Sequence, residues 1–293
     1  SMTRAALTLS DRHVLTVLGA LMREPLSYGE LKASVAGGSD STLSARLKSM
    51  VHDGLIDRTD AGRSVNYRLT DAGVATCPIF AALAQWEQDV LDPRRLLIHD
   101  ACGSTTQAIL TCSECDKQLD RSTVTLVIGP GTGFDERPSA RHRRRSTVNV
   151  SHPDALLNEI TVSVVGNYWS MAILAGVFGG VQTFGDLANA LGTPSAVLAE
   201  RLQDLVHLGI LEQFENDERG TRHGYRLSEI GAGLYPTMMM FLHWGDCWRS
   251  GESGPPMLHR HLDCDELFDP RLICSECRQP FTASTLTFAR VVG

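Results

Sequence analysis

Two sets of residue types that commonly bind metal ions occur in the sequence with the same spacing, His-x2-Cys-x9-Cys-x2-Cys. The first set is His99, Cys102, Cys112 and Cys115, and the second is His261, Cys264, Cys274 and Cys277. Each ligand of the second set lies 162 residues after its counterpart. Three thiolates and one imidazole match the ligand set of a closed tetrahedral zinc site, which has no open position for water or substrate. The pattern predicts two Zn²⁺ ions per chain, one in each set, with a structural role.

Disulfide bonds are the competing account of the cysteines, but the spacing favours metal binding. No secretory signal is recognisable, and Cys-x2-Cys pairs in a chain of 293 residues are typical of metal sites in a reducing compartment. We therefore expect a cytoplasmic protein. No apolar run reaches the roughly 18 residues that a transmembrane helix needs, so no membrane association is expected. Zinc or oxidant sensing through loss of a thiolate is the alternative to a purely structural role.

A histidine beside the second set and two further cysteines fall outside the repeated pattern. His259 competes with His261 as a ligand, but only His261 keeps the repeated spacing. Cys77 and Cys247 are not equivalent under the repeat, so we assign neither of them to a site.

The sequence does not favour an enzyme. Residues 129–133, Gly-Pro-Gly-Thr-Gly, superficially resemble a phosphate-binding loop, but no Walker lysine follows and the next residues do not open a helix. Zinc deaminases need a His-x-Glu motif and an open metal position, whereas here the repeated ligands fill the metal. We therefore expect a protein that is not an enzyme.

The repeat extends upstream of the metal ligands, so the elements that must position them also occur twice. The segment Tyr28-Gly29-Glu30-Leu31 corresponds to Phe184-Gly185-Asp186-Leu187, and Trp86 corresponds to Trp244. The offset drifts only between elements, as expected when insertions fall in loops. The chain is thus a tandem duplication.

Apolar periodicity within the first copy predicts three helices. A buried helix is expected over 13–23, and Ser27 with Glu30 forms a capping box before a short second helix. Asp40 or Ser41 can cap the third helix, which stops at Gly54.

The period then changes from that of a helix to that of a strand. Residues 55–58 and 64–69 predict a hairpin, and a longer helix is expected from about 71 to 90. Helix, helix, helix, hairpin, helix is the order of a winged helix-turn-helix unit. The second copy repeats this order, with a short helix at Phe184 to Leu191 and a third helix from Thr193.

Five segments of the second copy make the resemblance specific. They are Val165-Gly166-Asn167-Tyr168-Trp169-Ser170, Phe184 to Leu187, Leu198 to Leu202, Gly209-Ile210-Leu211 and Tyr225-Arg226-Leu227-Ser228. They resemble the HxlR family, over about residues 10–91 and 158–250. The resemblance implies a bacterial winged-helix transcription regulator, whose relatives usually carry one such domain per chain and act as homodimers. This chain departs from the pattern by carrying two units, each followed by its own cysteine-rich module.

These inferences predict a fold that is mainly α with small β (α+β). Its expected parts are two winged helix-turn-helix units at 10–91 and 158–250, zinc-ribbon-like modules at 92–131 and 251–293, and a linker at 132–157. The alternating segments 122–127 and 284–288 are expected to form ribbon strands whose stability depends on the metal.

In a helix-turn-helix unit, the amino end of the recognition helix reaches base edges while neighbouring elements contact phosphates. The candidates for contact with double-stranded DNA are Ser41, Thr42, Ser44, Arg46, Lys48, Arg63 and Arg68 in the first copy and Thr193, Ser195, Arg201, Arg219, Arg222 and His223 in the second. Arg46 and Arg201 occupy matching positions between leucines, so packing or an internal ion pair competes with a base contact.

A net charge of −7 disfavours nonspecific attraction to DNA, so binding would depend on local clusters of basic residues. We expect a sequence-specific DNA-binding regulator, a repressor, that acts as a fused pseudo-dimer with structural zinc. Further homodimerisation and an unknown small-molecule effector remain open. The alternatives are a zinc- or thiol-responsive regulator and a protein-interaction adaptor that has lost DNA binding.

Overall fold

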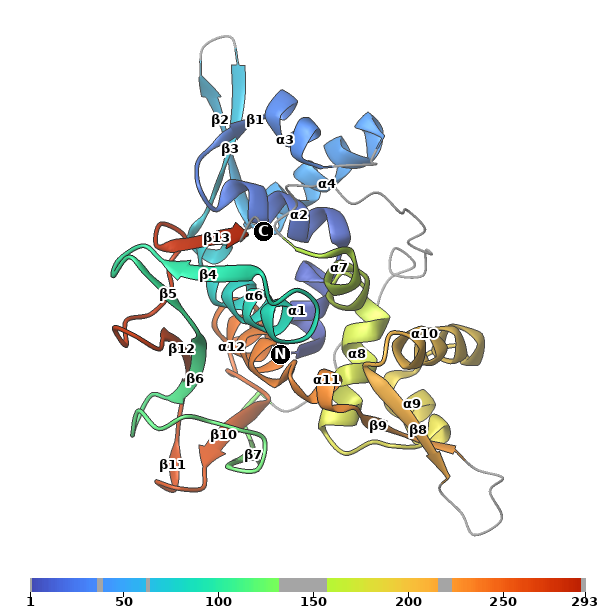
Figure 1. The fold of residues 1–293 in the computed structure, drawn as a ribbon. Coiled ribbons are helices and arrows are strands. Elements are labelled where there is room, and N and C mark those ends of the chain that lie inside the picture. Colours follow the sequence, from blue (N-terminus) through green and yellow to red (C-terminus); the bar gives the residue numbers. More distant parts are fainter. Residues whose placement is uncertain (1, 36–38, 62–63, 132–156, 216–222, 291–293) are drawn as a thin grey trace.

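The computed structural model describes residues 2–35, 39–61, 64–131, 157–215 and 223–290 (Figure 1). The first copy, here called repeat one, begins with α1 (Met2–Leu9), α2 (Arg12–Leu21), β1 (Leu26–Ser27), α3 (Tyr28–Ser34) and α4 (Asp40–His52). It continues with the wing strands β2 (Ile56–Ala61) and β3 (Ser64–Leu69), then α5 (Asp71–Val74) and α6 (Cys77–Val90). The strands β1, β3 and β2 form one antiparallel sheet.

Repeat two follows the same order. It contains α7 (Glu159–Val165), α8 (Tyr168–Phe178), α9 (Phe184–Leu191), α10 (Ser195–His207), the wing strands β8 (Leu211–Glu215) and β9 (His223–Leu227), α11 (Glu229–Ala232) and α12 (Tyr235–Arg249). The two wings extend from opposite ends of the molecule (Figure 1). The predicted α+β fold with two winged helix-turn-helix units is confirmed.

Local sequence explains most helix boundaries. The capping box of Ser27 and Glu30 is present at α3, as predicted. The cap of α4 is Ser39 rather than Asp40 or Ser41, because the Ser39 side chain accepts a hydrogen bond from the Thr42 N–H. The predicted helix over 71–90 is divided into α5 and α6, and Pro78 lies in the first turn of α6, where its missing N–H is tolerated.

Two helices were missed by the sequence patterns. Helix α1 precedes the first predicted winged unit and α7 lies at the start of the second. Both contact the opposite repeat, since α1 packs on α12 and α8 while α7 packs on α2. Their apolar faces are buried by a partner that is distant in sequence, which local periodicity does not identify.

The cysteine-rich segments form strands, and most of these strands have a partner in the other repeat. Repeat one supplies β4 (Arg95–His99), β5 (Ser104–Thr106), β6 (Ala108–Cys112) and β7 (Val124–Ile128), and repeat two supplies β10 (Met257–His261), β11 (Glu266–Leu267), β12 (Pro270–Cys274) and β13 (Leu286–Arg290). The predicted strands over 122–127 and 284–288 appear as β7 and β13. However, β7 pairs with β10, and β13 pairs with β4. The two modules therefore exchange strands rather than forming independent ribbons.

A pseudo-two-fold axis relates the two repeats. We call residues at equivalent positions mates; in the cysteine-rich modules they are 162 residues apart. The mates Leu110 and Leu272 face each other where β6 pairs with β12. The indole N–H of Trp86 donates to the carbonyl of Ile230 at 2.9 Å, and the indole of its mate Trp244 donates to Ala72 at 2.9 Å. Because Ile230 is the mate of Ala72, the two contacts are the same contact made in both directions.

The buried apolar side chains of both repeats form one continuous core. Within the described residues, no helix is both long enough and apolar enough to cross a membrane.

Candidate metal centres and DNA-contacting surface

The eight predicted metal ligands come together in two clusters, each of which draws on both repeats. The His99 cluster contains His99, Cys102, Cys274 and Cys277, and the His261 cluster contains Cys112, Cys115, His261 and Cys264. Within each cluster the ligand atoms all lie within 4.8 Å of one another, so each could hold a metal ion. The predicted grouping of four ligands within one repeat is wrong. Strand exchange brings the His-x2-Cys pair of one repeat to the Cys-x2-Cys pair of the other.

The geometry of the two clusters is nearly the same. In the His99 cluster, His99 Nδ1 lies 3.2 Å from Cys277 Sγ and 3.6 Å from Cys102 Sγ. The corresponding distances from His261 Nδ1 are 3.2 Å to Cys115 and 3.4 Å to Cys264. The sulfur atoms of Cys102 and Cys274 are 3.8 Å apart. All eight cysteines of the chain are free thiols.

Backbone conformation sets the direction of the ligating side chains. Asp116 and Arg278, which directly follow the second cysteine of each Cys-x2-Cys pair, have φ of 55° and 62°. Gly103 and its mate Asp265, which directly follow the cysteine of each His-x2-Cys pair, have φ of 68° and 58°. These left-handed residues make the tight turns that direct both ligands of a pair toward one point.

The surroundings of the two clusters differ at the position of Thr106. The Thr106 hydroxyl lies 3.0 Å from Cys274 Sγ. Burial raises the pKa of Cys274, but hydrogen bonds from Thr106 and from the backbone N–H groups of Cys277 and Glu276 outweigh it and lower the pKa to about 6. The mate of Thr106 is Phe268, which has no hydroxyl, and burial raises the pKa of Cys112 to about 11. Sequence reasoning missed Thr106, because no local signal connects it with a cysteine 168 residues away.

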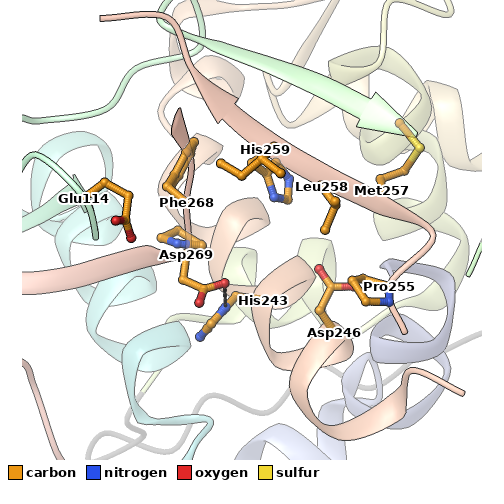
Figure 2. Close-up of a pocket in the computed structure, with 11 residues that line it drawn as sticks. Glu114, His243, Asp246, Pro255, Met257, Leu258, His259, Phe268 and Asp269 are labelled. Carbon is orange, nitrogen blue, oxygen red and sulfur yellow. Dashed lines mark ion pairs between the residues drawn. The ribbon is translucent and has the colours of Figure 1, made fainter. Parts of the chain in front are cut away.

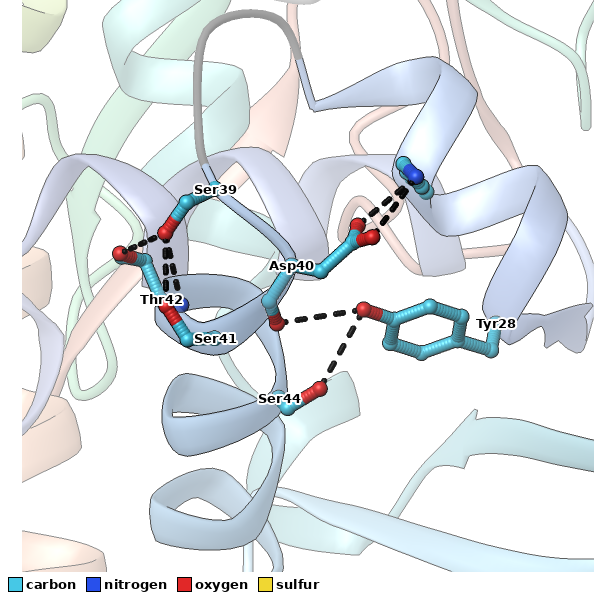
Figure 3. Close-up of polar contacts among 7 residues, drawn as sticks. Tyr28, Ser39, Asp40, Ser41, Thr42 and Ser44 are labelled. Atoms are coloured by element: carbon cyan, nitrogen blue, oxygen red, sulfur yellow. Dashed lines mark hydrogen bonds and ion pairs between the residues drawn. The ribbon is translucent and has the colours of Figure 1, made fainter.

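The amino end of α4, the predicted recognition helix of repeat one, is organised by polar contacts (Figure 3). Ser39 Oγ lies 2.8 Å from Ser41 Oγ and 2.9 Å from Thr42 Oγ1. Ser44 donates to the Tyr28 hydroxyl at 3.2 Å, which in turn donates to the Asp40 carbonyl at 3.2 Å. This network connects α3 to α4 and fixes the orientation of the hydroxyl groups.

The predicted basic contacts divide into two groups. Arg46, Arg68 and Arg201 are ion-paired within the protein, to Asp11 at 2.6 Å, to Asp57 at 3.2 Å and to Asp204 at 2.9 Å. Arg201 is the most enclosed of them, with 14% of its side chain exposed. Lys48, in contrast, is exposed on α4. The internal ion pair that competed with a base contact at Arg46 and Arg201 is therefore present at both positions.

In repeat two, Ser195 begins α10 and is exposed, and His223 is exposed at the start of β9. Thr193 is only 7% exposed, so it does not lie on the surface that DNA could reach. The helix predicted from Thr193 begins at Ser195, and Pro194 is its N-cap residue. The predicted wing residues Arg63, Arg219 and Arg222 lie outside the described residues.

Comparison with known proteins connects the winged units to one family. The model of the HxlR-like helix-turn-helix family matches residues 8–95 and 164–253. An uncharacterized HTH-type transcriptional regulator of Mycobacterium tuberculosis is 40% identical over 126 residues, which cover 43% of this chain and 80% of that protein. The HTH-type transcriptional regulator YvaP of Bacillus subtilis is 30% identical over 88 residues, covering 29% of this chain and 82% of that protein.

Two solved structures also match. A MarR-family transcriptional regulator from Porphyromonas gingivalis has 30% identity over 26% of this chain and 78% of its own, with a TM-score of 0.25. A second transcription factor has 28% identity over 42% of this chain and 79% of its own, with a TM-score of 0.30.

The two winged units and the sequence relatives define the class: the protein is a helix-turn-helix transcription regulator and not an enzyme. Because the family model matches both repeats and more than half of the residues, the chain belongs to the HxlR-like helix-turn-helix family.

Proposed function

We propose that the chain binds double-stranded DNA as a fused pseudo-dimer, in which its two winged units take the places of two subunits, and that it acts as a repressor. The reciprocal hydrogen bonds of Trp86 and Trp244 carry this proposal, because they relate the units as a two-fold dimer would. Two-fold dimers of helix-turn-helix proteins read half-sites about one helical turn, or a multiple of it, apart.

Exposed residues at the recognition helices and wings support DNA contact. Ser41 and Lys48 of repeat one and Ser195 and His223 of repeat two are exposed. Arg63, Arg219 and Arg222 stay proposed as phosphate contacts of the wings, and Arg46, Arg68 and Arg201 would need to exchange an internal carboxylate for DNA. Since the first turn of α4 carries Ser41 and Thr42 where α10 carries Ala196 and Val197, we expect an imperfectly palindromic operator.

We infer that both clusters bind Zn²⁺ and that the metal is structural. A tetrahedral ion with Zn–S bonds of about 2.3 Å places its sulfur ligands about 3.8 Å apart. The Sγ separation of 3.8 Å between Cys102 and Cys274, and of 3.9 Å between Cys112 and Cys264, supports this assignment. With four protein ligands each, the ions would hold the exchanged strands in place. In this proposal residues 92–131 and 251–293 form a joint zinc-binding layer, and 132–157 links the repeats.

DNA footprinting and native mass spectrometry of the operator complex test the proposal. We expect one chain to protect both half-sites. Two chains per pair of half-sites would refute the fused pseudo-dimer and favour a homodimer with four winged units, whereas failure to select any sequence would favour a protein-interaction adaptor.

A matched pair of lysine variants tests the reading surface. Lys48→Ala should weaken binding and, if Lys48 contacts a phosphate, reduce the salt dependence by about one unit of slope. The control is Lys117→Ala, because Lys117 is ion-paired with Asp263 in the zinc-binding layer at 3.1 Å. Equal affinities of the two variants would contradict the assignment of α4.

A thiol-responsive regulator is the second candidate, favoured by Cys102, which is exposed to solvent. Oxidants react with accessible thiolates and would remove a ligand from the His99 cluster. Treatment with hydrogen peroxide should then release zinc and lower DNA affinity together. Zinc release without any change in DNA affinity would leave the metal with a structural role alone.

A further inference from the structure

A pocket beside the zinc-binding layer has chemistry that neither the DNA-contacting surface nor the metal clusters use (Figure 2). It has a volume of about 220 Å³ and lies between α12, the strands β10 to β12 and the turn that holds Glu114. Its lining therefore includes residues of both repeats.

The depth of the pocket contains an unsatisfied imidazole. His259 is 5% exposed, and its Nε2 atom is buried with no hydrogen-bond partner. In Figure 2 the His259 ring extends from β10 toward the side on which His243 and Asp269 lie. A buried polar atom without a partner costs free energy, so a group that hydrogen-bonds to this nitrogen would bind favourably.

The rest of the lining combines an apolar wall with an acidic rim. Met257, Leu258 and Phe268 supply the wall, and the carboxylates of Glu114, Asp246 and Asp269 supply the rim. None of the described lining residues is lysine or arginine, and the Nδ1 atom of His243 lies 3.8 Å from the Oδ1 atom of Asp269 (Figure 2). An apolar body with a positive charge fits this arrangement, because the carboxylates attract a cation and the ring of Phe268 can face it.

Comparison of the repeats indicates how the site arose. The mate of His243 is Gln85, whose side-chain oxygen accepts a hydrogen bond from the Ala108 N–H at 2.9 Å. The mate of Ala108 is Pro270, which has no N–H to donate. A glutamine at position 243 would therefore find no backbone N–H at position 270 to bind.

Two further polar residues of the lining, His259 and Asp269, have no ionisable mate in repeat one. The mate of His259 is Leu97, and that of Asp269 is Gln107, so repeat one has an apolar side chain and a neutral amide at these positions.

We propose that this pocket binds a small organic ammonium ion whose apolar body packs on Met257, Leu258 and Phe268 and whose N–H groups reach His259 and the acidic rim. Because α12 belongs to the second winged unit and Glu114 to the first repeat, the ligand would contact both halves of the chain. A role of this ligand as an effector rests on the proposed DNA-binding function, whereas the binding of the ligand to the pocket does not.

Calorimetry on the full-length, zinc-loaded chain tests the proposal with three probes of one shape: benzylamine, benzyl alcohol and benzoate. We expect benzylamine to bind with one molecule per chain, benzyl alcohol at least about tenfold more weakly, and benzoate not at all. Equal binding of all three, or no binding of benzylamine, would overturn the proposal. Stoichiometric binding of Ni²⁺ through His259 without amine binding would overturn it in favour of a metal site.

Variants that copy repeat one locate the ligand. His259→Leu introduces the side chain that Leu97 provides in repeat one and should weaken benzylamine about tenfold, the effect of losing one hydrogen bond. Glu114→Gln should measurably weaken the binding of benzylamine. Glu276→Gln, which changes the mate of Glu114 at the other cluster, should leave that binding unchanged. Zinc content and thermal unfolding confirm that each variant is folded. Unchanged affinity in folded His259→Leu would refute the site.

A gel shift with and without benzylamine separates the effector role from the site. A change in DNA affinity that His259→Leu abolishes supports an effector, and an unchanged affinity refutes that role while leaving the binding measurement intact. Absence of DNA binding in every sample would refute the proposed function instead.

Discussion

The exchange of ligands between repeats makes an unusual prediction about zinc stoichiometry. Cys102→Ser with Cys277→Ser removes two ligands from the His99 cluster and none from the His261 cluster. Cys102→Ser with Cys115→Ser removes one ligand from each cluster. If each set of four ligands acted within its own repeat, the two double variants would have the opposite effects.

The magnitude follows from the contribution of each ligand. A structural zinc site is worth on the order of 10–16 kcal/mol, so one of four ligands contributes about 3–4 kcal/mol. This corresponds to a loss of affinity of about 10²- to 10³-fold per ligand. A competing chelator of intermediate affinity therefore distinguishes intact sites from damaged ones.

We expect the variant Cys102→Ser/Cys277→Ser to keep one tightly bound Zn²⁺ and the variant Cys102→Ser/Cys115→Ser to keep none. Elemental analysis after chelator treatment measures both, with Cys247→Ser as a control that keeps two because Cys247 lies outside both clusters. One tight ion in the Cys102→Ser/Cys115→Ser variant and none in the other would refute the shared clusters.

Two further predictions concern the contacts between the repeats, and a third concerns a buried ion pair within repeat one. A protease site inserted within residues 132–156 should, after cleavage, leave both halves in one particle on gel filtration, and a zinc chelator should weaken their association; separation with zinc still bound would contradict this. Trp86→Phe and Trp244→Phe should each lower the free energy of unfolding by about 1–3 kcal/mol in urea, because each leaves a carbonyl unpaired; a loss confined to one of them would refute the two-fold equivalence. Arg95→Met should lower the free energy of unfolding by about 3–5 kcal/mol, because it removes the guanidinium that lies 2.7 Å from the buried carboxylate of Glu87. Burial raises the pKa of Glu87, so folding favours its protonated form. The loss of unfolding free energy in Arg95→Met should therefore be largest above that raised pKa and shrink as pH falls through it. A loss that is independent of pH would contradict the charge argument.

The sequence identified the residues that carry the metal chemistry, but it did not show which of them contact one another in the fold. The types and spacing of the eight metal ligands were sufficient to single them out. The same spacing is compatible with ligation within one repeat or between two, because the His-x2-Cys and Cys-x2-Cys pairs are identical turns in either arrangement. Only the pairing of β7 with β10 and of β13 with β4 decides between them.

The predicted DNA-contacting residues show the same limit. Arg46 was a reasonable candidate from its place on the recognition helix, but Asp11, 35 positions earlier, neutralises it in the folded chain. Thr193 was chosen as a polar residue next to a helix start, and packing buries it. Polarity can be read from a sequence, whereas the side chain that a polar group meets depends on the tertiary fold.

The shared clusters also constrain how the two halves can change. Each half supplies only two of the four ligands of each cluster, so a half that exchanged its partner for another protein would expose two incomplete clusters. The covalent link keeps the two halves in a fixed ratio, which lets one diverge in its polar residues, as at His259 and Leu97, without losing its counterpart. The chain thus resembles a heterodimer whose subunits cannot be exchanged.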